Sequence, residues 1–169
     1  QGGGAVDLPQ VTIPVTTATI TPDGVLDEAA WKKAVVLTFA DSMGRDTKVR
    51  YPTRLRLLYD ARHLYAAFEA TDADVSCPYS KRDDPIYDHE AVELFMMPNV
   101  AAPAVGPYIE LQASPKGVIF DAAFIARRTG MDTSFNGRQT VGTKIDGTLN
   151  VDDGSDRGFV SEWVVPWRG

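Results

Sequence analysis

The chain has 169 residues, 44% of them apolar and 24% charged, which is the composition of a single globular domain with its own hydrophobic core. The formal net charge is −6 and the 17 lysine and arginine residues are scattered, so no basic stripe is available for nucleic acid or for an anionic membrane surface. No apolar run approaches the roughly 20 residues that cross a bilayer, so we expect neither a nucleic-acid partner nor a membrane span.

The first ten residues, QGGGAVDLPQ, are rich in glycine and lack the basic and apolar regions of a signal peptide. We therefore predict a flexible tether over residues 1–10, of the kind that follows a cleaved signal or a lipid-anchored residue, although an arbitrary chain boundary would look the same. Residues 11–169 are expected to form the folded domain. Cys77 is the only cysteine, which excludes an intramolecular disulfide.

The predicted elements begin with a strand over residues 11–20. One short helix is predicted over residues 26–34, where Asp27 can cap the first turn and the alanines and lysines favour the helical state. A strand over residues 35–39 follows.

The next two predicted strands form a hairpin. In TRLRLLYD, residues 53–60, Leu55 and Leu57 point to one face while the two arginines point to the other. HLYAAFEA, residues 63–70, repeats this alternation. The polar connection between them is short, so the two strands are expected to pair in antiparallel fashion.

Five further strands complete the prediction, with glycine or proline in nearly every gap between them. They cover residues 91–97, 108–113, 118–124, 140–145 and 159–165. Many short strands at close spacing indicate an all-β fold, an antiparallel β-sandwich of the jelly-roll type with one short helix.

Three segments together resemble the family 9 carbohydrate-binding modules. They are TPDGVLDEAAW (21–31), LLYDARHLYAAFEATD (57–72) and DDPIYDHEAVELFMMP (83–98). The resemblance implies an exported protein, whether periplasmic, secreted or a cell-surface lipoprotein, that binds a sugar chain end or a polysaccharide without catalysis, often with structural calcium. Such motifs mark a fold better than they mark a ligand.

The resemblance also implies a sugar site on four residues. Tyr87 stands where the family places one of the two aromatic rings, usually tryptophan, that sandwich a terminal sugar. Glu93 alternates with apolar neighbours, so it is predicted to project away from the core and to accept charge-assisted hydrogen bonds from sugar hydroxyls. Glu110 and Gln112 match positions where a sugar-binding member carries Arg and Asn; Gln112 keeps the amide, whereas Glu110 reverses the charge.

A first alternative is a scaffold or interaction domain. In the family, the strand that ends in a Pro-Trp pair, here Pro166-Trp167, is followed by further strands and by the second stacking Trp. We therefore expect the sandwich to lack its final strands, and its open edge to pair with a second polypeptide or with another copy of the chain. In this interpretation the sugar site has decayed.

A second alternative is an electron-transfer sandwich that holds haem b. Some sandwiches of related shape bind haem between methionine and histidine or lysine. The sequence supplies these ligand types in Met96, Met97, His63 and His89.

Four acids precede the predicted strand at 91–97, namely Asp83, Asp84, Asp88 and Glu90. They suggest a glycosidase. Glycoside hydrolysis, however, needs two carboxylates at a defined separation in space, and closeness in sequence does not establish that separation. We expect a protein that is not an enzyme and that has no organic cofactor. Asp72 and Asp74 are candidates for a structural calcium site, with no ligand set assigned.

Overall fold

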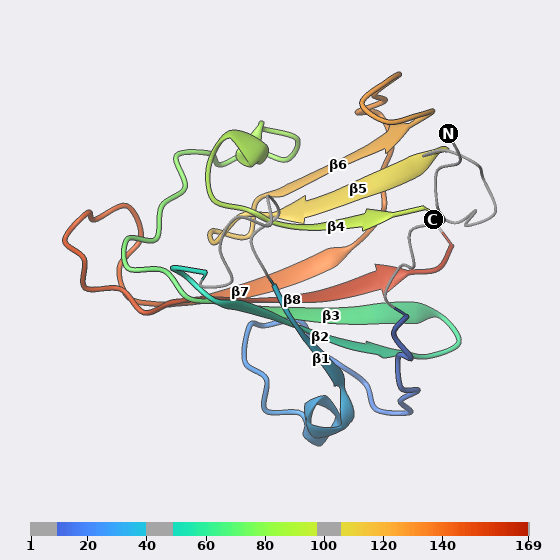
Figure 1. The fold of residues 1–169 in the computed structure, drawn as a ribbon, viewed down its shortest axis with the longest axis horizontal. Helices are drawn as coiled ribbons and strands as arrows, with labels where there is room; N and C mark the ends of the chain where they lie inside the picture. Colours follow the sequence, from blue (N-terminus) through green and yellow to red (C-terminus); the bar gives the residue numbers. More distant parts are fainter. Residues whose placement is uncertain (1–9, 40–48, 98–105, 169) are drawn as a thin grey trace, which may run out of the picture.

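The computed structural model describes residues 10–39, 49–97 and 106–168, which form two antiparallel β-sheets packed face to face (Figure 1). Residues 1–9 of the predicted tether lie outside this range. The five-stranded sheet has the order β1-β2-β3-β8-β7 and the three-stranded sheet the order β4-β5-β6. The predicted all-β sandwich is therefore confirmed.

The five-stranded sheet contains β1 (Val35–Thr38), β2 (Thr53–Tyr59), β3 (His63–Ala70), β7 (Thr140–Asp146) and β8 (Gly158–Pro166). The three-stranded sheet contains β4 (Val92–Met96), β5 (Tyr108–Ala113) and β6 (Ile119–Phe124). Two short 3₁₀ turns, η1 (Ala29–Lys33) and η2 (Ile86–Asp88), complete the described elements. No helix within the described residues is long and apolar enough to cross a membrane.

One predicted strand is wrong, and the predicted short helix is present as a 3₁₀ turn. Residues 11–20 form no strand, because Pro14 has no N–H to donate, and only Val15 makes an isolated bridge, with Tyr59 at the end of β2. The helix expected over residues 26–34 is the 3₁₀ turn η1, which follows Glu28 without a side-chain cap. Asp27 therefore does not cap it, and so short a segment is marginal as an α-helix.

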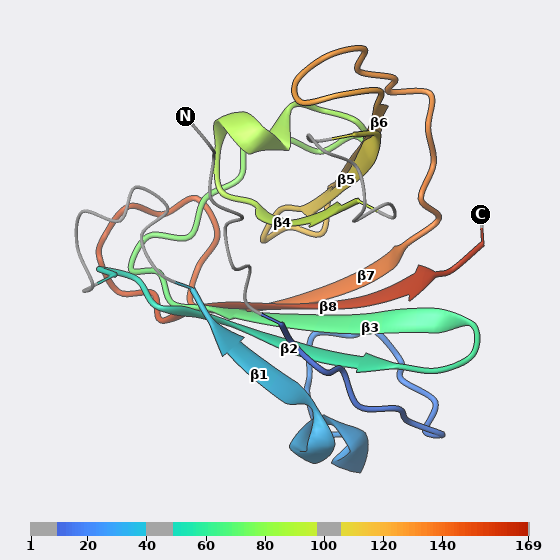
Figure 2. The same ribbon diagram turned by 45° about the vertical axis from the view of Figure 1, so that its right-hand side comes forward.

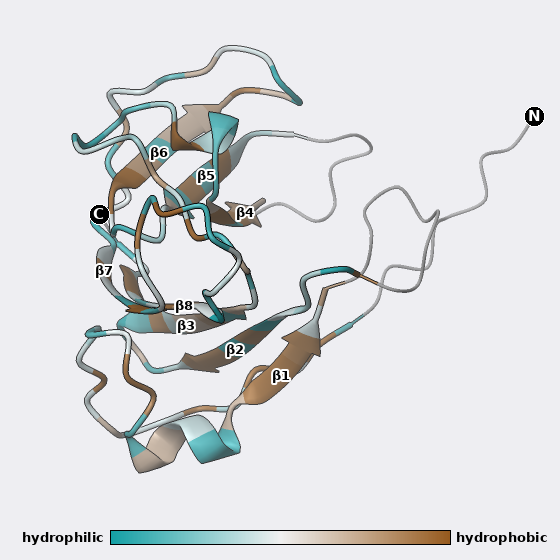
Figure 3. Ribbon diagram, turned by 90° about the vertical axis from the view of Figure 1, so that its left-hand side faces the viewer, coloured by the Kyte–Doolittle hydropathy of each residue, from teal (hydrophilic) through white to brown (hydrophobic). Residues whose placement is uncertain are grey.

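The hairpin alternation fills the space between the two sheets with apolar side chains. Leu57 pairs with Ala66 across β2 and β3, and both point into the core with Phe68. Leu111 of the three-stranded sheet meets them from the opposite side. Trp163 of β8 also points inward and is fully buried, with its ring centroid 5.2 Å from that of Phe68. Figure 3 shows the matching apolar stretches in the strands of both sheets.

The outer face of the five-stranded sheet is partly covered by the segment that precedes β1, as Figure 2 shows. Trp31 of η1 is 2% exposed and packs in a cluster with Leu58 and Tyr65, whose side chains point away from the main core. We call this region, centred on Trp31, Leu58, Tyr65 and Glu162, the covered face. The strand alternation alone predicts a solvent-exposed surface here, and the overlying segment buries it.

Glu162 of β8 is the polar centre of the covered face and is fully buried. Its Oε1 accepts a hydrogen bond from the Trp31 indole Nε1 at 2.9 Å. Its Oε2 accepts the backbone N–H groups of Asp23 and Gly24, each at 3.1 Å. Both carboxylate oxygens therefore have donors, and they tie the covering segment to the sheet.

Candidate functional site

The register of the three-stranded sheet brings three of the predicted site residues onto one face. Glu93 of β4 is paired with Gln112 of β5, and Phe95 with Glu110. Side chains two residues apart on a strand point to the same side, so all four project from the outer face, away from the core. We call this surface, with Tyr108, Phe120 and Phe124, the open face.

The turn η2 places Tyr87 over the open face. Its neighbour Ile86 is fully buried in a cluster with Phe120, which anchors the turn to the sheet. Tyr87 itself stays 47% exposed and meets Phe120 edge-on, with ring centroids 5.1 Å apart and an interplanar angle of 78°. Its ring is thus held in place on one side and available to a ligand on the other.

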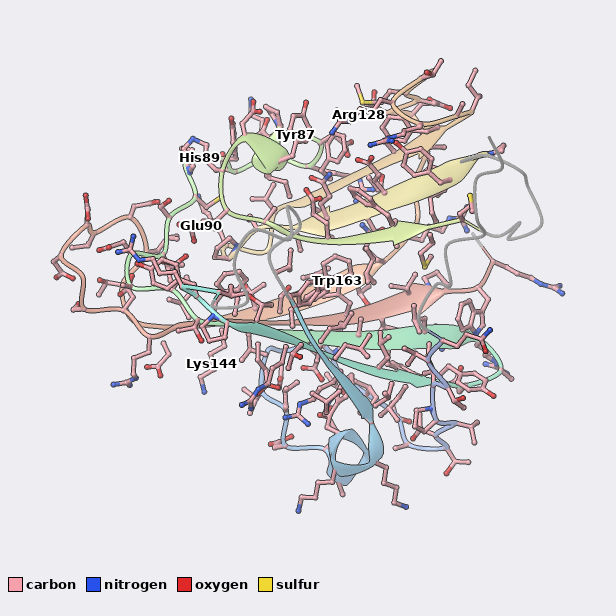
Figure 4. All side chains as sticks on the ribbon, in the orientation of Figure 1. Tyr87, His89, Glu90, Arg128, Lys144 and Trp163 are labelled. Carbon is pink, nitrogen blue, oxygen red and sulfur yellow. The ribbon has the colours of Figure 1, made fainter. Side chains whose placement is uncertain are left out.

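A hollow of about 850 Å³ lies over this surface, and we call it the open-face pocket. All four predicted residues, Tyr87, Glu93, Glu110 and Gln112, line it. The remaining lining is mostly apolar or aromatic and comprises Phe95, Met97, Tyr108, Phe120, Phe124 and Met131, together with two arginines, Arg127 and Arg128. Figure 4 shows Tyr87 and Arg128 above the three-stranded sheet, on the side away from the buried Trp163.

Several of these lining residues were not predicted from the sequence. Phe95 follows Glu93 by two residues, so the alternation that orients Glu93 also orients Phe95 and gives a usable signal. Phe120 and Phe124 follow the same alternation on β6. Arg127 and Arg128 lie in a turn after β6, and no periodicity tells to which side a turn projects.

The floor of the pocket holds a buried amide with an unused acceptor. Gln112 is 1% exposed, and its Nε2 donates to Glu110 Oε2 at 3.3 Å. Its Oε1 is buried and accepts no hydrogen bond from the described residues. A buried polar atom left in this state costs about 1–3 kcal/mol.

The two glutamates of the pocket raise its negative charge. Partial burial raises the pKa of the Glu93 carboxyl, and the nearby Glu110 carboxylate raises it further. Neither carboxylate forms an ion pair within the described residues. Both can therefore accept hydrogen bonds from a polyol, and ionised acceptors form the stronger bonds.

None of the four acids that suggested a glycosidase lines the open-face pocket, and two of them, Asp84 and Glu90, accept hydrogen bonds from the protein. Asp84 Oδ2 accepts the backbone N–H groups of Ser80 and Lys81 at 3.1 and 2.9 Å. Glu90 Oε1 accepts both the backbone N–H and the hydroxyl of Ser76 at 3.0 Å. These carboxylates therefore have structural uses.

The calcium expectation stays a prediction. Asp72 Oδ1 accepts the backbone N–H of Asp74 at 3.0 Å, and Asp74 Oδ1 accepts that of Gly154 at 2.6 Å. Within the described residues no group of three or more His, Cys, Asp or Glu side chains is arranged to hold a metal ion.

The haem alternative draws no support from the described residues. Met96 packs against the main core and Met97 against the outer-face cluster, so the two point to opposite sides of the three-stranded sheet. His63 lies at the start of β3 beside Asp60 and Tyr65, and His89 packs edge-on against Tyr79. Neither histidine lines a hollow that the methionines line.

Two other hollows have linings less suited to a polar ligand. One of about 650 Å³ on the five-stranded sheet contains Arg157 and Asp146, which form a two-bond ion pair at 2.5 and 2.7 Å. Another of about 410 Å³ lies between the sheets and is lined mainly by apolar side chains, among them Met96, Ile109 and Val165. The open-face pocket combines exposed rings with unpaired acceptors.

Comparison with solved structures defines the class of fold, which is that of the family 9 carbohydrate-binding modules. No family model matches the sequence, and no curated protein matches it significantly. A crystal structure from Bacteroides uniformis ATCC 8492, provisionally described as a carbohydrate-binding protein, superposes with a TM-score of 0.73 over 93% of this chain and 72% of that chain, at 14% identity.

A family 9 carbohydrate-binding module from Caldicellulosiruptor kristjanssonii is similar to this chain as well. Its complex with cellotriose gives a TM-score of 0.60 at 16% identity, over 93% of this chain and 68% of that chain. Its complex with glucose gives the same TM-score and identity over 69% of that chain. The resemblance predicted from the sequence is therefore confirmed for the fold.

Proposed function

We propose that this protein is a non-catalytic carbohydrate-binding domain that holds a sugar chain end or a polysaccharide in the open-face pocket. The likeness in fold to a module solved with cellotriose and with glucose supports this proposal. At 16% identity that likeness concerns the fold, so the assignment depends on the chemistry of the pocket itself.

The observation that carries the proposal is the exposed ring of Tyr87 in the same hollow as Glu93 and Glu110, two carboxylates without an ion pair among the described residues. A sugar presents an apolar C–H face and hydroxyl groups around its edge. In the pocket Tyr87 offers a ring for the C–H face, and the Glu93 and Glu110 carboxylates offer acceptors for hydroxyls. Ligand pockets generally combine an apolar lining with a few polar groups in this way.

The carboxylates are arranged for binding rather than for hydrolysis. Glu93 and Glu110 project from the same face of one sheet, so they approach a bound ring from the same side. Glycoside hydrolysis requires two carboxylates that flank the scissile bond. In the proposed complex both accept hydrogen bonds from hydroxyl groups, and the Gln112 amide donates to Glu110 beside them.

The proposal is tested by affinity electrophoresis and a glycan array with the wild type and Tyr87→Ala. Loss of the ring should weaken binding at least tenfold, which corresponds to about 1.4 kcal/mol. Tyr59→Ala is the matched control, because Tyr59 is 39% exposed on the five-stranded sheet and lies outside the pocket. Equal retardation of the wild type and a folded Tyr87→Ala on every glycan would exclude this site.

A further inference from the structure

We infer that the open-face pocket binds an acidic oligosaccharide, in which a uronic acid places its carboxylate against Arg127 and Arg128. This inference rests on the proposed function and specifies its substrate class. It starts from the two arginines, which the neutral-sugar chemistry of Tyr87, Glu93 and Glu110 leaves unused.

Both arginines are exposed and line the open-face pocket. Within the described residues, neither guanidinium lies within 4 Å of a carboxylate oxygen, and the arginines that do form ion pairs are Arg56, Arg82 and Arg157. The guanidinium groups of Arg127 and Arg128 are therefore available to an anion. A planar guanidinium binds a carboxylate through two parallel hydrogen bonds, which gives both strength and direction.

The backbone fixes Arg128 at the rim of the pocket. Arg128 has φ 53, a left-handed conformation that favours glycine, and its turn is closed by a hydrogen bond from the Thr129 N–H to the Ala126 carbonyl at 3.0 Å. The Arg128 N–H also donates to the Tyr108 hydroxyl at 3.3 Å. Non-glycine residues persist in this conformation where the surroundings hold them, and such positions cluster at binding sites.

Tyr108 joins this rim to the floor of the pocket. Its ring is 8% exposed and stacks on Phe124, with centroids 4.7 Å apart and an interplanar angle of 7°. Tyr108 lies on the same strand and the same face as Glu110 and Gln112. The arginine turn is thus attached to the strand that carries the polar floor.

The acceptors and the backbone of the arginine turn lie beside different rows of the three-stranded sheet. Glu93 and Gln112 form one cross-strand row, and Tyr108 and Phe124, next to the arginine turn, form another row four residues away along β5. Four residues of a strand span about 13 Å. This length suits two linked sugar rings, with hydroxyls of one ring at Glu93 and the carboxylate of the next at the arginines.

The charges also select the orientation of such a ligand. A carboxylate near Glu93 and Glu110 would be repelled, whereas beside the arginines it is attracted. A neutral oligosaccharide gains nothing from the arginines beyond ordinary hydrogen bonds. The pocket should therefore distinguish an acidic sugar from a neutral sugar of the same shape.

The test measures binding by isothermal titration calorimetry with oligogalacturonates and alginate oligosaccharides, each beside its methyl ester, which removes the charge and keeps the ring. The acid form of at least one of them should bind at least tenfold more tightly than its ester at low salt. This preference should shrink as salt is added. The double variant Arg127→Gln/Arg128→Gln should bind the acid no more tightly than its methyl ester.

Arg138→Gln is the matched control, because Arg138 is also exposed, has φ 52 and lies outside the pocket. It should keep the full preference. Arg128→Gly, which suits the left-handed backbone, should lower the preference without loss of folding. Circular dichroism of each variant checks that the fold is intact.

The outcomes separate this inference from the proposed function. If neutral glycans or methyl esters bind as tightly as the acids, or if the double variant keeps the preference, the inference is overturned and the sugar site stands. If sulfated glycans alone bind, the carboxylate assignment is likewise wrong. If no glycan of any charge binds the folded wild type, both proposals fail together.

Discussion

The two outer faces of the sandwich each bury polar side chains, but they use them differently. On the covered face, Glu162 is fully buried and both of its oxygens accept hydrogen bonds from the protein. On the open face, Gln112 is equally buried, and its Oε1 accepts none from the described residues. The covered face therefore satisfies its buried polar group within the chain, whereas the open face leaves one acceptor of its buried amide without a donor among the described residues.

The difference comes from what lies over each sheet. The segment before β1 brings an indole N–H from Trp31 and two backbone amides to Glu162, so the polar group is satisfied within the chain. Over the open face, η2 and the arginine turn rise at the rim, and they leave a hollow above Gln112. Burial raises the pKa of both Glu162 and Glu93, so a raised pKa does not by itself distinguish the two faces.

The largest effect is expected from Glu162→Ala on the covered face. Trp31 Nε1 and two backbone amides would lose their acceptor, and the free energy of unfolding should fall by about 3 kcal/mol or more. Urea denaturation measures this loss. Glu162→Gln retains one acceptor oxygen and should lose less. Carbohydrate binding by the folded fraction should be unchanged, and an unaltered urea midpoint would contradict the structural role of Glu162.

Gln112→Met on the open face should show the opposite behaviour to Glu162→Ala: weaker carbohydrate binding with little change in stability. Methionine has a similar volume and removes the unpaired oxygen along with one 3.3 Å hydrogen bond to Glu110, so stability should change by less than about 1 kcal/mol. Carbohydrate affinity, measured by affinity electrophoresis, should fall at least tenfold, because the Glu110 carboxylate loses the amide that holds it in the pocket. Undiminished affinity in a stable variant would show that Gln112 plays no part in binding.

The effect of Glu93→Gln on the pH dependence of stability tests the raised pKa of Glu93 in the pocket. An unfolded glutamate titrates near 4.5, and the folded protein raises the pKa of Glu93, so the native state binds more protons in this range. This contribution to stability is present at acid pH and is lost as the pH rises through the folded pKa. The variant should therefore gain stability relative to the wild type between pH 4 and pH 7. Urea midpoints that differ by the same amount at both pH values would refute the expectation.

The smallest effect is expected when the left-handed backbone strain at Arg128 is relieved. Arg128→Gly should raise the free energy of unfolding by no more than about 1 kcal/mol, because glycine adopts a positive φ without steric cost while its unfolded chain has more freedom. Gly24→Ala on the covered face should instead destabilise, since a Cβ there would lie 2.5 Å from the backbone nitrogen of Lys144. Thermal denaturation compares the two, and equal shifts would contradict the comparison.

Local alternation was sufficient to predict most of the sheet framework. The hairpin of β2 and β3 and the orientation of Glu93, Glu110 and Gln112 follow from the two-residue period of a strand. The same reasoning failed for residues 11–20, where Pro14 interrupts pairing.

Contacts between segments that are distant in sequence could not be predicted from local alternation. The partner of Trp31 Nε1 is Glu162, which lies 131 residues away in sequence. The arginines that line the open-face pocket belong to a turn whose direction depends on a hydrogen bond to Tyr108, 20 residues earlier. Pairings of this kind appear only when the chain has folded, so neither the dry covered face nor the basic rim was foreseen.

Two adjacent residues of the turn η2 have different roles: Ile86 anchors the turn, and Tyr87 is exposed. Ile86 holds the turn against the sheet, while the Tyr87 ring extends over the pocket beside it. The exposed position can therefore take a larger or smaller ring without disturbing the residue that keeps the turn in place. This separation makes residue 87 a natural point at which to retune the affinity of the domain by protein engineering, with the supporting scaffold left untouched.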